Sequence, residues 1–133
     1  MTIEIPCLTG KQTQALIEAA EQVALRFCSP VFLVGSAVEK IHPNDIDIYV
    51  AVNGQTYLRL FTNYGRKTES ESDHVKNMDD MKIQQAKIYK KQKDYFESKV
   101  KAWDFDIKFQ NLEQFLKHDG KRIRLDYIYS NVW

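Results

Sequence analysis

The sequence has few cysteines, no long apolar run and no excess of charge of one sign. Cys7 and Cys28 are the only cysteines among 133 residues, and they lack the paired CxxC spacing of a zinc or redox centre, so we expect two reduced thiols. No apolar run approaches the roughly 18 residues that a membrane-spanning helix needs. The first ten residues, MTIEIPCLTG, contain no basic segment followed by a long apolar stretch. These absences argue against a membrane or secreted protein and favour a cytoplasmic one.

The bulk composition predicts one soluble globular domain. Apolar residues make up 44% of the chain and charged residues 28%, which is typical of a folded protein. The net charge of +1 gives no broad electrostatic footprint for nucleic acid. The length is that of one domain and no internal repeat is present. We therefore expect residues 1–133 to form a single domain around one core.

Hydrophobic periodicity predicts alternating helices and strands. Residues 10–27 carry apolar side chains at helical spacing, and Thr9 and Gln12 have the spacing of a capping box at the start of that helix. The apolar run VFLV, residues 31–34, is typical of a strand that is buried on both faces. RIRLDYIY, residues 122–129, predicts a last strand. The fold class expected from this order is α/β or α+β, with helices flanking a mixed sheet.

Two further predicted strands carry carboxylates on one face. DIDIYVAV, residues 45–52, alternates acidic and apolar residues before becoming fully apolar, so Asp45 and Asp47 share a face. WDFDIKF, residues 103–109, alternates in the same way and places on one face Asp104, Asp106 and Lys108. Carboxylates that converge from two strands are the ligands that hard divalent cations prefer. The sequence therefore predicts a metal site between these strands.

The segment between the two acidic strands, residues 53–102, is predicted to be an insertion that is mainly helical. Its first part, residues 55–62, is consistent with a short helix. Residues 65–80, GRKTESESDHVKNMDD, are polar and poor in apolar residues, so we expect a loop. Residues 81–101 have the composition and the apolar spacing of an amphipathic helix.

Gly35 and Ser36 follow the buried strand and have the features of a phosphate-binding turn. Glycine allows close backbone approach, and a helical turn that starts here would offer backbone N–H groups and a hydroxyl to a phosphate. Ser36 and Glu39 have capping-box spacing, which predicts the start of a short helical turn. We expect this turn to face the same cavity as Asp45 and Asp47.

The combination of a hydrophobic strand, Gly-Ser, a short turn and Asp-Ile-Asp-Ile resembles the signature of the polymerase-beta-like nucleotidyltransferase superfamily. The resemblance covers about residues 13–52 and 103–129, and small minimal nucleotidyltransferases share this plan. It implies a mixed sheet flanked by helices and two Mg²⁺ ions held by Asp45, Asp47 and Asp106. It also implies transfer of a nucleoside monophosphate from a nucleoside triphosphate to a hydroxyl acceptor, with release of pyrophosphate.

The residues alone leave the third acid open among Asp104, Asp106 and Asp126, because strand parity does not separate Asp104 from Asp106. Lys108 shares their face, where it could contact a phosphate or pair with a neighbouring carboxylate. Three histidines, His42, His74 and His118, lack metal-ligand spacing. Three aromatic residues lie near the C-terminal end, Tyr127, Tyr129 and Trp133. They could stack on a base or belong to the core.

Two departures from the family pattern motivate an alternative function. Only eight residues separate Ser36 from Asp45, and Glu39-Lys40 stands where minimal members often have Arg-Gly. The alternative is a catalytically inactive module that binds nucleotide or a protein partner, as in an antitoxin or a phage accessory protein. No separate substrate domain follows, so the acceptor would be recognised by residues 53–102, by a partner in a homo-oligomer or by another protein.

Overall fold

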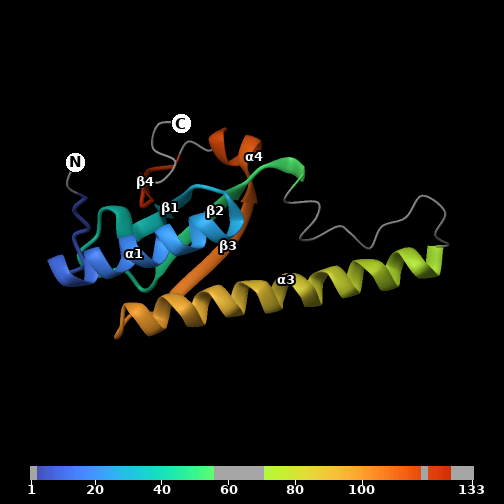
Figure 1. The fold of residues 1–133 in the computed structure, drawn as a ribbon, viewed down its shortest axis with the longest axis horizontal. Coiled ribbons are helices and arrows are strands. Elements are labelled where there is room, and N and C mark those ends of the chain that lie inside the picture. The colour runs from blue at the N-terminus through green and yellow to red at the C-terminus, as the bar shows by residue number, and fades with distance from the viewer. Residues whose placement is uncertain (1–2, 56–70, 118–119, 127–133) are drawn as a thin grey trace.

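The computed structural model describes residues 3–55, 71–117 and 120–126, and it shows an α+β fold with a four-stranded mixed sheet (Figure 1). The elements in chain order are α1 (Gly10–Phe27), β1 (Val31–Val34), the single 3₁₀ turn η1 (Gly35–Val38), β2 (Ile46–Val52), α3 (Glu71–Lys99), β3 (Phe105–Asn111), α4 (Leu112–Leu116) and β4 (Arg122–Arg124). The fold class predicted from the sequence is confirmed. Among the described helices, none combines the length and the apolar character needed to cross a membrane.

The sheet has the strand order β3-β2-β1-β4. β1 runs antiparallel to both β2 and β4, whereas β2 and β3 are parallel. The parallel pair requires a long connection, and α3 supplies it, because this helix crosses back along the sheet before β3 begins (Figure 1). The two predicted acidic strands are therefore neighbours in space, although residues 53–104 separate them in the sequence.

The two faces of the sheet are covered differently. α1 and the C-terminal part of α3 pack on one face and close the main core, which includes Leu16 and Val23 of α1, Phe96 of α3, and Ile48 and Ile107 of the strands. The short helix α4 lies on the other face, where Phe115 packs on Phe32 with ring centroids 4.6 Å apart. Successive strand residues point to opposite faces, so each strand contributes to both environments.

Two local predictions, the capped start of α1 and the strand at residues 31–34, are confirmed because local sequence decides them, and the start of α4 is fixed locally as well. α1 begins at Gly10 behind a complete capping box, in which the Thr9 hydroxyl accepts from the Gln12 backbone and the Gln12 side chain accepts from the Thr9 backbone. α4 begins after Asn111, whose side chain accepts from the Glu113 backbone N–H at 3.0 Å. β1 spans the predicted residues 31–34.

The loop predicted for residues 65–80 is wrong where the structure describes it, because α3 already begins at Glu71. Residues 71–80 lack apolar periodicity, and Figure 1 shows the reason: the N-terminal half of α3 extends past the sheet. Because this half of the helix does not lie over the sheet, its sequence needs no apolar stripe, and the pattern that predicts a helix is missing. Residues 56–70, which include most of the short helix predicted for 55–62, lie outside the described part of the chain.

The C-terminal half of α3 packs into the main core. Phe96 is fully buried and stacks on Phe105 of β3 with centroids 5.5 Å apart. Glu97 accepts a hydrogen bond from the backbone N–H of Phe105 at 3.0 Å and one from Lys93 at 2.8 Å. The Lys93 hydrogen bond, and after it the Phe105 N–H, hold the pKa of Glu97 below its usual value. These contacts fix the start of β3 and so position Asp106.

Candidate functional site

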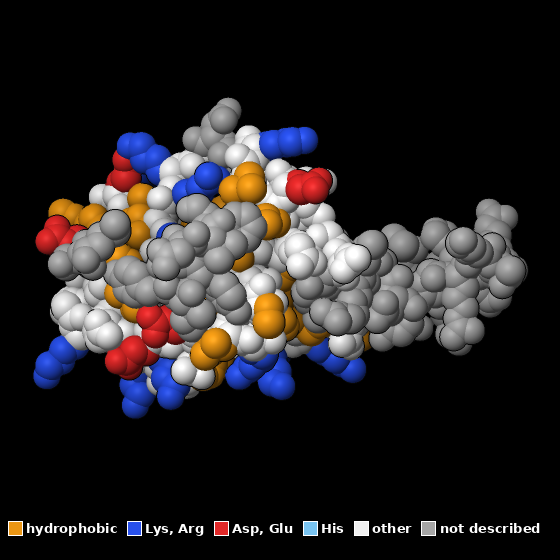
Figure 2. Space-filling model, turned by 45° about the horizontal axis from the view of Figure 1, so that its top comes forward, with side chains coloured by type: hydrophobic (Ala, Val, Ile, Leu, Met, Phe, Trp, Pro, Cys, Tyr) orange, Lys and Arg blue, Asp and Glu red, His pale blue; other side chains and the backbone are white. Residues whose placement is uncertain are grey.

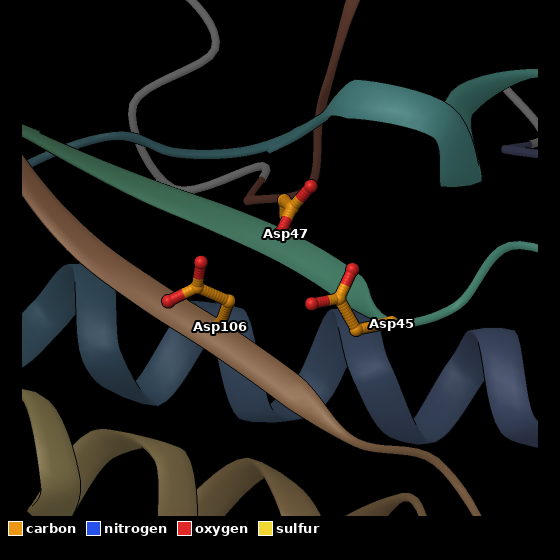
Figure 3. Close-up of side chains that lie close together, drawn as sticks. All are labelled: Asp45, Asp47 and Asp106. Atoms are coloured by element: carbon orange, nitrogen blue, oxygen red, sulfur yellow. The ribbon is translucent and has the colours of Figure 1, made fainter.

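Three carboxylates from β2 and β3 converge on the sheet face opposite α1 and α3. In the parallel register Asp47 lies beside Asp106, and Asp45 precedes β2 on the same face as Asp47. One oxygen of each carboxylate lies within 4.8 Å of one oxygen of each of the others. Figure 3 shows the three side chains rising from the same side of the two strands. The structure therefore brings together the three acids that the resemblance assigns to metal.

Asp104, one alternative for the third acid, lies just outside β3. The strand begins at Phe105, so the alternation that predicts a shared face for Asp104 and Asp106 does not extend to residue 104. The backbone carbonyl of Asp104 accepts from the N–H of Ile46 at 2.9 Å. Its carboxylate is exposed, and its negative charge helps to raise the pKa of Lys93 on α3. Asp104 is therefore not part of the cluster.

Asp126, the other alternative, has a structural role. Its side chain is buried, with 1% of the residue exposed, and Oδ1 accepts from the backbone N–H of Val31 at 2.8 Å. Arg124 forms an ion pair with its other oxygen at 3.3 Å. Val34 is the residue of β1 that pairs with Asp47. Val31 lies three residues from Val34, a distance of about 10 Å at the rise of a β-strand. Asp126 anchors the start of β1 and takes no part in the acidic cluster.

Burial and the neighbouring acids raise the pKa of Asp47. Desolvation is the largest cause, followed by the negative charges of Asp45 and Asp106, and the positive charge of Lys108 partly opposes them. Lys108 Nζ lies 3.8 Å from Asp106, so the prediction that this lysine pairs with a neighbouring carboxylate is confirmed. A divalent cation between the acids would reverse the penalty on their charged forms.

Gly35 is required where β1 ends, for two independent reasons. Its φ of +73° lies in the left-handed region. A Cβ atom at this position would lie 2.5 Å from Oδ2 of Asp47, closer than real Cβ contacts allow. The backbone of residue 35 therefore touches the acidic cluster, and Gly35 and Ser36 face the same site as Asp47.

The helical turn predicted after Gly35 is present, but its capping box is not. η1 begins at Gly35 rather than after Ser36, so Ser36 lies inside the turn and its hydroxyl does not cap it. The Ser36 carbonyl accepts from the backbone N–H of Lys40 at 2.8 Å and closes the turn. The Glu39 side chain, predicted to reach back to residue 36, pairs with Lys121 instead. A long-range ion pair thus overrides the local motif.

A cavity of about 630 Å³ lies over these residues. Asp47 and Asp106 line one side of it, and Gly35 and Ser36 line another. Its wall also contains two aromatic side chains and two lysines, namely Tyr49, Phe115, Lys108 and Lys121. We call this cavity the acidic pocket. Its combination of carboxylates, backbone turn and lysines suits a phosphorylated ligand with a divalent cation.

The strand register arranges the residues of this face in two rows. The row at the acidic end runs from β3 to β4 through Asp106, Asp47, Val34 and Arg122. The next row contains Lys108, Tyr49, Phe32 and Arg124. Negative charge is therefore concentrated on β2 and β3, whereas the positive charge of the first row lies on β4. A polyanion bound to metal at the acids can extend across β1 toward β4.

A larger cavity of about 890 Å³ lies elsewhere, between the N-terminal segment and α1. Ile5, Leu8, Thr13 and Ile17 contribute to its wall. Neither the three acids of the cluster nor the Gly35-Ser36 turn lines it. We place the candidate site in the smaller cavity, because the chemistry-bearing residues converge there.

Of the remaining candidates, those that the structure describes do not line the acidic pocket. Lys90 and Lys93 pair along α3 with Asp94 and Glu97 at i,i+4 spacing. Figure 2 shows Lys and Arg side chains spread around the rim of the visible face rather than gathered into one patch. His42 is exposed in the segment before β2. The side chain of His74 and residues 118, 127, 129 and 133 lie outside the described part of the chain.

Sequence reasoning missed Glu39, Lys121, Tyr49 and Phe115 as pocket residues. Tyr49 could have been found, because it follows Asp47 by two positions and shares its face. Lys121 and Glu39 meet only through the pairing of β1 with β4, which no local pattern encodes. Comparison of the chain with protein-family models, curated proteins and solved structures found no match to any of them.

Proposed function

We propose that the protein is a metal-dependent nucleotidyltransferase that moves a nucleoside monophosphate from a nucleoside triphosphate to a hydroxyl acceptor, with release of pyrophosphate. One observation carries this proposal. The carboxylates of Asp45, Asp47 and Asp106 converge within 4.8 Å at a pocket that the Gly35-Ser36 turn also lines. The resemblance of residues 31–50 to the superfamily signature agrees with this arrangement.

The donor set fits two Mg²⁺ ions. Magnesium prefers carboxylate oxygens, and Asp45, Asp47 and Asp106 supply them from two adjacent strands. Desolvation and then crowding of negative charge raise the pKa of Asp47, and a cation would relieve this cost of its charged form. The ions would supply charge neutralisation on the phosphates and on the leaving pyrophosphate. Asp45 and Asp47 would hold both, with Asp106 completing the ligand set of one.

The residues of the chain would then position the reactants. The acceptor oxygen attacks the α-phosphorus, and the bond from this phosphorus to the bridging oxygen of the β-phosphate breaks. Asp106 stands at the side of the cluster toward the edge strand β3, from which an acceptor can approach, and its carboxylate would take the hydroxyl proton. The turn at Gly35-Ser36 would hold the phosphates on the β1 side.

The acceptor is a small molecule, an RNA end or a protein side chain, and these remain separate outcomes of the assay. We propose that the reaction takes place in the cytoplasm. The described residues include no separate acceptor domain. We therefore propose that residues 53–102, a second copy of the chain or another protein supplies acceptor recognition.

The test is a transfer assay with α-labelled nucleoside triphosphates, Mg²⁺ and pooled small-molecule, RNA and protein acceptors, with self-labelling scored as well. Asp45→Asn, Asp47→Asn and Asp106→Asn should each remove the labelled product. Asp104→Asn is the matched control and should retain it, because Asp104 lies outside the cluster. Equal product from the wild type and the three cluster variants would contradict the proposal. Nucleotide-dependent stabilisation with no product against any acceptor would instead indicate the inactive binding module.

A further inference from the structure

An ion pair between Glu39 and Lys121 spans the acidic pocket. Glu39 follows η1, Lys121 precedes β4, and both side chains line the cavity. Neither is buried, since the Lys121 and Glu39 side chains are 71% and 57% exposed. The residues are 82 positions apart in the sequence, so the fold alone brings them together.

The strand register places Lys121 beside the phosphate-binding turn. The pairing of β1 with β4 sets Val34 opposite Arg122. Gly35 follows Val34, Lys121 precedes Arg122, and both residues line the acidic pocket. The acids lie on the other side of this turn, on β2 and β3. A phosphate chain that starts at the metal-binding acids and passes over Gly35-Ser36 therefore reaches Lys121.

The two arginines of β4 are committed to structural contacts. Arg122 donates to the carbonyl of Phe115 at 3.2 Å and lies over the Phe115 ring, 5.0 Å from its centroid. Arg124 pairs with the buried carboxylate of Asp126. Lys121, in contrast, pairs with an exposed carboxylate, and exposed ion pairs contribute little and exchange readily.

We propose that Lys121 binds the terminal phosphates of the nucleotide, and that Glu39 holds this lysine in the ligand-free protein. The inference deepens the proposed function and rests on it, because it names a phosphate ligand of the same pocket. A triphosphate offers more negative charge and more acceptor oxygens than one carboxylate, so it displaces Glu39 from the ammonium group. Glu39 and the phosphates therefore compete for the same ammonium group, and this competition lowers nucleotide affinity.

The test measures binding of inorganic tripolyphosphate in the presence of Mg²⁺ to the full chain by isothermal titration calorimetry. Lys121→Gln should weaken binding roughly 10-fold, and Lys121→Arg should keep it within about 3-fold of wild type. Glu39→Gln should tighten binding about 3-fold. This gain should disappear when Glu39→Gln is combined with Lys121→Gln. Lys117→Gln, an exposed lysine outside the pocket, is the matched control and should bind as the wild type does.

The outcomes separate this inference from the function on which it rests. If the wild type binds Mg²⁺-tripolyphosphate, Asp47→Asn abolishes binding and Lys121→Gln leaves it unchanged, the role of Lys121 is overturned and the metal site stands. If the wild type shows no binding, both proposals are overturned. A gain from Glu39→Gln that persists without Lys121 would overturn the competition between Glu39 and the ligand.

Discussion

The two faces of the sheet are made by alternate residues of the same strands, yet they have opposite physical characters. Ile46, Ile48 and Val50 of β2 are fully buried against α1 and α3. Asp47 and Tyr49, the residues between them, line the acidic pocket, where desolvation and then the neighbouring like charges raise the pKa of Asp47. The helix-covered face stabilises the fold, whereas the pocket face carries an electrostatic cost that only a ligand would relieve.

The difference predicts which substitutions cost stability. Ile48→Ala should produce the largest loss, about 4 kcal/mol of unfolding free energy, because it removes a fully buried side chain from the central strand. Urea-induced unfolding followed by circular dichroism measures it. Tyr49→Phe, on the pocket face of the same strand, is the control and should change the unfolding free energy far less. Equal losses would break the distinction between the faces.

Asp126→Ala should cost about 3 kcal/mol, because it removes the buried partner of Arg124 and the acceptor of the Val31 N–H. Asp104→Ala, at an exposed carboxylate, should leave stability nearly unchanged. Thermal and urea unfolding of the two variants would compare them directly. A larger loss for Asp104→Ala would mean that the roles assigned to these two acids are reversed.

Gly35→Ala should cost about 2 kcal/mol, since alanine is strained at a φ of +73° and its Cβ would collide with Asp47. The same variant should lose divalent-metal binding, because the carboxylate of Asp47 must move. Metal titration and unfolding of this variant should therefore both change. Gly10→Ala is the control, since no atom lies within 4 Å of the position of its Cβ. Unchanged metal binding in Gly35→Ala would show that this turn does not belong to the site.

Much of this arrangement could be predicted from the sequence, because alternation and capping are local. The acid pair Asp45 and Asp47, the strand carrying Asp106 and the capped start of α1 all follow from such patterns. The choice of Asp106 over Asp104 could not be predicted from the sequence, because the alternation of a strand places both residues on the same face. The start of β3 at Phe105 decides between them. The Glu39–Lys121 pair depends on the meeting of β1 and β4, and the helical character of residues 71–80 has no apolar pattern to reveal it.

Mn²⁺ binding to the wild type and to Asp47→Asn, followed by electron paramagnetic resonance of the free ion together with thermal unfolding, tests the metal site most directly. We predict that the wild type binds Mn²⁺ and unfolds at a higher temperature when the ion is present. Asp47→Asn should bind Mn²⁺ far more weakly, and without metal it should be at least as stable as the wild type, because the variant relieves the crowded charge. Equal Mn²⁺ binding by both proteins, or a clear loss of metal-free stability in Asp47→Asn, would contradict the account.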